Sequence, residues 1–179
     1  MIKIEDYRNN LIENIQLDFI GKSIPPQNAV FERLTSILSH VGDLGKDIFE
    51  GFSNEFSFYG FSFSSESNTL QIITIVYEGG QNIRNLQKLE VETKFKKLEK
   101  LITFIQEKKY KNLEETSEFY DCCSEIYEYF YREEVKNVNF ILISDLLLPK
   151  SLYQINNKLI NKIDYSYSIF DIEFFFQIH

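Results

Sequence analysis

The sequence contains few of the residues on which metal sites and nucleophilic sites usually depend. It has two cysteines, two histidines, three prolines and no tryptophan among 179 residues. The cysteines, Cys122 and Cys123, are adjacent, so they cannot link distant segments or form a Cys-x-x-Cys motif. His40 and His179 lie far apart in the sequence, which leaves little for a His-based metal site or a Ser-His-Asp triad. We therefore expect a reduced protein with no catalytic residue and no cofactor.

Long apolar runs and an excess of positive charge are also missing. No apolar run approaches the roughly 20 residues that a membrane-spanning helix needs. The first residues carry charges where a signal peptide would be apolar. The chain has 19 basic and 27 acidic residues, a net charge of −8, whereas domains that hold a phosphate backbone are usually basic. We expect a cytoplasmic protein with no membrane partner, for which nucleic acid is a disfavoured ligand.

The apolar residues that are present predict one globular domain over residues 1–179. They make up 44% of the chain, and no Pro- or Gly-rich linker divides it. Helical spacing predicts helices within 4–15, 30–41, 91–105, 119–130 and 172–178, and shorter apolar runs predict strands within 56–63, 70–76, 138–143 and 165–169. Residues 43–53 are punctuated by Gly and Asp, which predicts irregular structure. The order ααββααβ(α)βα indicates an α/β or α+β domain with a single mixed sheet and flanking helices.

This order of elements is also that of restriction-endonuclease-like domains. Such enzymes hold a divalent metal with acidic residues from two strands, beside a lysine that polarises the phosphate. The first expected strand has Tyr59 where an Asp is wanted, and the second has neither an acid nor a lysine. Glu50, Glu55 and Glu78 lie near the strand ends and are the candidate metal ligands, with surface carboxylates as the alternative interpretation.

Four lysines are the candidate nucleic-acid-binding residues. They are Lys94, Lys97, Lys100 and Lys108, on or just after the expected helix 91–105. Glutamates are interleaved with them, and alternating charge of this kind is also typical of a solvated helix face.

Asp171 occupies a position that is typical of a helix N-cap. It follows an apolar strand and precedes the apolar residues of the expected terminal helix. At such a position the side-chain oxygen accepts a hydrogen bond from a free backbone N–H. We expect a structural cap, and a ligand site is the alternative.

Several stretches carry a resemblance to a known family. They are residues 4–10, 30–34 and 38–42 in the opening helices, 58–63 and 70–72 in the hairpin, and 138–145 and 165–174 in the closing strands. Together they resemble the N-terminal domain of the abortive-infection phage-resistance (AIPR) proteins of bacteria. Tyr59 stands where the family often has Asp, and Phe170 where it often has Trp. The resemblance implies a role in phage defence and implies that the chain is the N-terminal domain of a longer protein.

Three functions fit these observations. The first is a non-catalytic structural or interaction module, whose partner is the C-terminal region of the same protein or another copy. The second is a metal-dependent nuclease that uses the displaced acids, and the third is a nucleic-acid-binding sensor that uses the lysine face. The missing acids and lysine favour the first, so we expect a protein that is not an enzyme.

Overall fold

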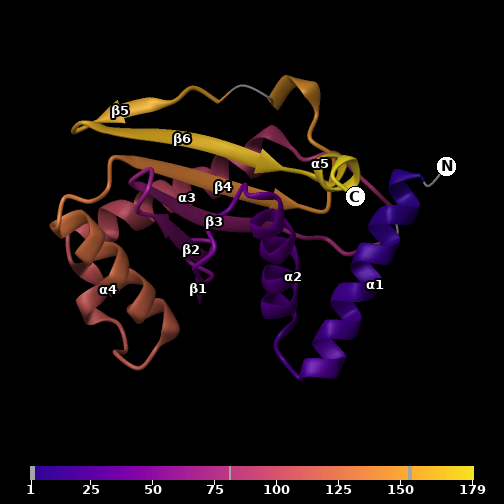
Figure 1. Ribbon diagram of the computed structural model, residues 1–179, viewed down its shortest axis with the longest axis horizontal. Helices are drawn as coiled ribbons and strands as arrows, with labels where there is room; N and C mark the ends of the chain where they lie inside the picture. Colours follow the sequence, from indigo (N-terminus) through magenta and orange to yellow (C-terminus); the bar gives the residue numbers. More distant parts are fainter. Residues whose placement is uncertain (1–2, 81, 153–154) are drawn as a thin grey trace.

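The computed structural model describes residues 3–80, 82–152 and 155–179 of the chain. Within these residues a single six-stranded mixed sheet is flanked by helices, as Figure 1 shows, and this confirms the α+β class. The helices are α1 (Ile4–Lys22), α2 (Pro26–Val41), α3 (Lys88–Gln106), α4 (Glu118–Tyr131) and α5 (Ile172–Gln177). The strands are β1 (Ile48–Ser53), β2 (Phe58–Ser64), β3 (Thr69–Val76), β4 (Asn137–Ser144), β5 (Lys158–Ile160) and β6 (Ile163–Phe170), and two short 3-10 turns cover Lys109–Asn112 and Lys150–Leu152.

The strand order of the sheet is β1-β2-β3-β4-β6-β5. Strands β3, β4 and β6 are parallel neighbours, while β1, β2 and β5 pair antiparallel with their neighbours. Since β3, β4 and β6 run in the same direction, their carboxyl ends meet at one edge of the sheet, which we call the carboxyl edge.

Helices cover both faces of the sheet and make a three-layer domain. Successive residues of a strand point to opposite faces, so β3 sends Leu70 and Ile72 into one core and Ile73 and Ile75 into the other. The first core contains the apolar face of α3 and the buried residues of α4, and the second contains apolar residues of α1, α2 and α5. Burial on both faces explains why β3 and β4 are almost continuously apolar.

The expectation of irregular structure is confirmed for residues 43–47 and was wrong for residues 48–53, because β1 occupies Ile48–Ser53 at one side of the sheet. Its pairing with β2 shifts register between Glu50 and Ser53, and the intervening Gly51 packs against α4. A Cβ on Gly51 would lie 2.6 Å from the sulfur of Cys122 and 2.9 Å from the backbone oxygen of Glu118. The glycine that suggested a break therefore permits close packing of strand and helix. The three-residue strand β5 was not expected either, and all its residues are exposed.

We predict that Leu98→Ala on α3 lowers the free energy of unfolding by about 2–5 kcal/mol, because the side chain is fully buried. The matched control is Leu89→Ala on the same helix, whose side chain is 73% exposed, and its effect should stay within about 0.5 kcal/mol. Urea denaturation of both variants measures the difference. Equal losses would contradict the packing of α3 on the sheet.

Candidate functional site

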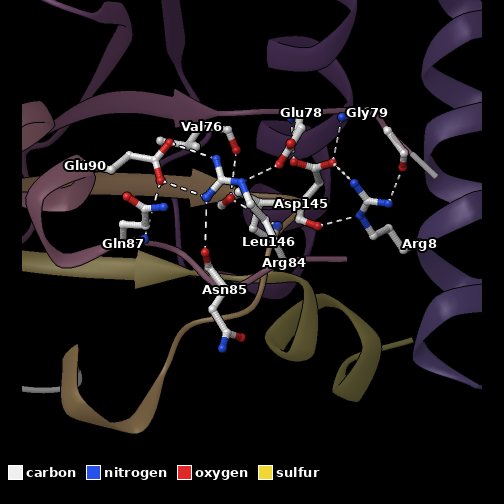
Figure 2. Close-up of polar contacts among 12 residues, drawn as sticks. Arg8, Val76, Glu78, Gly79, Arg84, Asn85, Gln87, Glu90, Asp145 and Leu146 are labelled. Carbon is white, nitrogen blue, oxygen red and sulfur yellow. Dashed lines mark hydrogen bonds and ion pairs between the residues drawn. The ribbon is translucent and has the colours of Figure 1, made fainter. Parts of the chain in front are cut away.

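A fully buried ion pair joins α1 to the carboxyl edge of the sheet. Nη2 of Arg8 lies 2.7 Å from Oδ2 of Asp145, the residue that follows β4, and both side chains are 0% exposed. Nε of Arg8 donates to the backbone oxygen of Asp145 at 2.7 Å, and Nη1 donates to the backbone oxygen of Gly80 at 2.6 Å. All three guanidinium nitrogens are therefore hydrogen-bonded (Figure 2).

The carboxylate of Asp145 also fixes the loop that follows β3. Its Oδ1 accepts from the backbone N–H of Glu78 at 2.9 Å, and its Oδ2 accepts from that of Gly79 at 3.0 Å. Gly79 has φ +63°, a left-handed conformation that glycine adopts without a steric penalty. Because a charge removed from water must be compensated by partners, these bonds are what makes the burial of Asp145 tolerable.

The chain just after β4 makes further bonds with three other segments. The hydroxyl of Ser144 donates to the backbone oxygen of Val76 at 2.7 Å and accepts from the backbone N–H of Leu146 at 3.1 Å. The backbone N–H of Leu86 donates to the backbone oxygen of Leu147 at 2.8 Å, and the backbone N–H of Ile172 donates to the backbone oxygen of Leu146 at 3.1 Å. The ends of β3 and β4, the approach to α3 and the start of α5 are thus held together.

Glu78, one of the candidate metal ligands, points away from the buried pair toward Arg84. Nε of Arg84 lies 2.7 Å from Oε2 of Glu78, and Nη1 of Arg84 lies 3.1 Å from Oε2 of Glu90 (Figure 2). The hydrogen bond from Arg84 is the main reason why the pKa of Glu90 is lowered. This cluster is partly exposed and adds a surface network to the buried pair.

Asp171 follows β6 at the same edge and uses both carboxylate oxygens. Oδ1 accepts from the backbone N–H of Phe174 at 2.9 Å, which caps α5. Oδ2 accepts from the backbone N–H of Leu148 at 2.7 Å, which holds the chain after β4. The side chain therefore caps one element and anchors another.

The structure does not bring the three candidate metal ligands together around one ion. Glu55 is exposed in the β1–β2 turn, while Glu50 is half-buried on β1 and accepts a hydrogen bond from Asn28. Burial raises the pKa of Glu50, and the negative charge of Glu118 raises it further. In the described part of the chain, no three or more His, Cys, Asp and Glu side chains form a group that could hold a metal ion.

The four candidate lysines do not form a uniform free stripe. Nζ of Lys94 is half-buried and donates to the hydroxyl of Ser57 at 3.4 Å, and burial lowers its pKa. Lys97 is half-buried, whereas Lys100 and Lys108 are both exposed. The ammonium of Lys108 lies 5.0 Å from the centre of the Tyr127 ring, so we take Lys100 as the exposed lysine to test.

The adjacent cysteines lie in the first core. Burial, followed by the charge of Asp121, raises the pKa of Cys122 to about 12, and burial also raises the pKa of Cys123. Both thiols therefore stay protonated at neutral pH, which does not suit a nucleophile.

Comparison with known families identifies the chain. The model of the abortive infection phage resistance protein N-terminal domain matches residues 31–177. The chain belongs to this family. The match includes Asp145 and Asp171 and begins within α2, so α1 and its Arg8 lie outside it. No curated protein and no solved structure matches the chain significantly. No helix in the described part of this AIPR domain is long and apolar enough to span a membrane.

Sequence reasoning missed the Arg8–Asp145 pair, although the sequence holds one signal for it. Arg8 falls in helical register with Ile4, Leu11 and Ile15, so the apolar stripe of α1 contains one charged residue. Because a buried arginine needs a buried acceptor, that position predicts a partner without saying which one.

We predict that Arg8→Met lowers the free energy of unfolding by about 3–5 kcal/mol, because it leaves the carboxylate of Asp145 buried without its counter-charge. The matched control is Arg33→Met, which breaks the partly exposed pair with Asp18. Its loss should be about 0–1 kcal/mol. Urea denaturation measures the free energy of unfolding of both variants. Similar losses would show that the buried pair contributes no more to stability than the partly exposed pair does.

We predict that Asp171→Asn recovers only part of the stability that Asp171→Ala loses. A simple N-cap, worth about 0.5–2 kcal/mol, is largely restored by Asn. Here two N–H groups need acceptors, from Phe174 and Leu148, and an amide side chain offers one oxygen and one donor. Thermal melts of the wild type and both variants test this. Full recovery by Asn would mean that the bond to Leu148 contributes nothing.

Proposed function

We propose that this AIPR domain is a non-catalytic structural and interaction module of a phage-resistance protein. The partner is the C-terminal region of the same protein or another copy of this chain. The family supports a role in abortive infection, and the non-catalytic role rests on the carboxyl edge.

The observation that carries this proposal is that three acids at the carboxyl edge, Asp145, Asp171 and Glu78, are used for internal bonds. Open α/β sheets bind ligands in a crevice beyond the carboxyl ends of their strands. Here Asp145 accepts from Arg8 and two backbone N–H groups, Asp171 accepts from two backbone N–H groups, and Glu78 pairs with Arg84. These carboxylates would have to leave those bonds before they could hold a metal ion or move a proton.

Two assays test this proposal. We expect the purified protein to cleave neither DNA nor RNA with Mg²⁺ or Mn²⁺, because hard cations need free carboxylate oxygens. Metal-dependent cleavage that disappears in Glu50→Gln, Glu55→Gln or Glu78→Gln would establish the nuclease alternative instead. Gel-shift assays with DNA and RNA, using Lys100→Glu as the variant, test the sensor alternative in the same preparations.

Phage challenge of cells tests the interaction role. We expect the longer protein to lose protection when this domain is removed, and the domain to capture a partner polypeptide in pull-down assays. Protection that survives removal of the domain would contradict the proposal.

A further inference from the structure

The side of the sheet formed by β1 differs from the carboxyl edge, because the acids that line it form no ion pair in the described part of the chain. β1 is the last strand on this side, and in the described part of the chain no strand pairs with its outer side. Helix α4 packs beside it at Gly51. A groove of about 310 Å³ lies between the strand and the helix.

The floor of this groove is aromatic. Phe49 of β1 stacks on Phe61 of β2, with ring centres 4.8 Å apart and planes inclined by 13°. Phe61 is fully buried, whereas Phe49 remains 41% exposed. The exposed ring offers an apolar contact and a face on which a cation can rest.

The walls of the groove carry one sign of charge. Three carboxylates of α4 line it, from Glu118, Asp121 and Glu125, and Glu50 of β1 lines it as well, although its carboxylate accepts a hydrogen bond from Asn28 of α2. Spacings of three and four residues place the α4 carboxylates on one side of the helix. Among the residues that the structure describes, none of the four forms an ion pair with a lysine or arginine. The groove thus combines an open aromatic ring with uncompensated negative charge.

We propose that this groove binds a lysine- and arginine-rich segment of a partner protein, with an apolar side chain of that segment on Phe49. The proposal rests on the interaction role argued above and names the chemistry of the partner. Charge complementarity supports it, because cationic side chains on either side of the anchor would face the carboxylates of β1 and α4. Burial, followed by the charge of Glu118, raises the pKa of Glu50, and a cation bound beside it would favour its ionised form.

Fluorescence anisotropy of the intact chain with a labelled peptide tests the proposal. The probe is the peptide Gly-Arg-Lys-Leu-Lys-Phe-Arg-Lys-Gly. One control peptide has Glu in place of each basic residue, and another has Ser in place of Leu and Phe. We expect saturable binding of the probe that weakens as salt screens the charges, with no binding of the acidic peptide and weaker binding of the serine peptide.

A pair of charge-matched variants locates the binding. Glu118→Lys/Glu125→Lys alters the groove, while Glu13→Lys/Glu66→Lys alters exposed acids on α1 and the β2–β3 turn. Each double variant changes the net charge from −8 to −4. We expect the groove variant to bind the probe roughly tenfold or more weakly and the control variant to bind within about twofold of wild type. Equal weakening in both would mean that only net charge attracts the peptide, and would overturn the proposal.

A Phe49→Ala variant keeps the proposal testable if the charge reversals disturb α4. This variant should bind the probe peptide more weakly than wild type, while its affinity for the serine control peptide should be unchanged. Thermal melts verify that each variant is folded. Competition by Mn²⁺ that disappears in the groove variant would indicate a cation site instead and would also overturn the proposal. The protein could fail to bind the peptide, cleave no nucleic acid and still capture a partner. That result would refute the proposed binding to the groove and leave the proposed function standing. Nuclease activity would refute the proposed function and leave the groove measurements standing.

Discussion

The buried ion pair between Arg8 and Asp145 is the constraint on which the rest of the domain depends. Each charge has left water entirely, so each requires several well-placed partners at once. Those partners belong to α1, to the loop after β3 and to the chain after β4, and they are all satisfied in one arrangement. A shift of α1 along the sheet would leave a buried charge without a partner. The pair therefore makes a displaced packing of α1 unfavourable.

That constraint also explains which acidic residues of this AIPR domain remain accessible to a ligand. The carboxyl edge of β3, β4 and β6 is crossed by the chain after β4, and Asp145 and Asp171 there bond to Arg8 and to backbone N–H groups. The side of the sheet at β1 has an exposed aromatic ring and carboxylates that form no ion pair among the residues the structure describes. The same residue type, an acid beside a strand, is thus a fold determinant at one place and a surface feature at another. Burial and the available donors make the difference.

The sequence predicted most elements and the class of the fold, because those depend on periodicity. Helix α3 and strands β3 and β4 have strong patterns and lie where their apolar residues indicated. Strand β1 was missed because its six residues include a glycine and a register shift, which are tertiary adaptations to α4. The pairing of Arg8 with Asp145 joins residues 137 positions apart, and local patterns do not encode such a contact. For the same reason Glu50, Glu55 and Glu78 looked alike in the sequence, although they meet three different environments.

The position of Arg8 also bears on what constitutes the physical domain. The family match begins at residue 31, within α2, yet the second core contains Tyr7, Leu11 and Ile15 of α1 beside Ile141 and Ile143 of β4. Removing α1 would expose that apolar face and leave Asp145 buried without its counter-charge. A buried charge without its partner carries an uncompensated desolvation cost, which destabilises the loop that Asp145 holds. We therefore expect the cooperative unit to include the helix that lies outside the matched residues, and the buried charge of Arg8 is the physical reason.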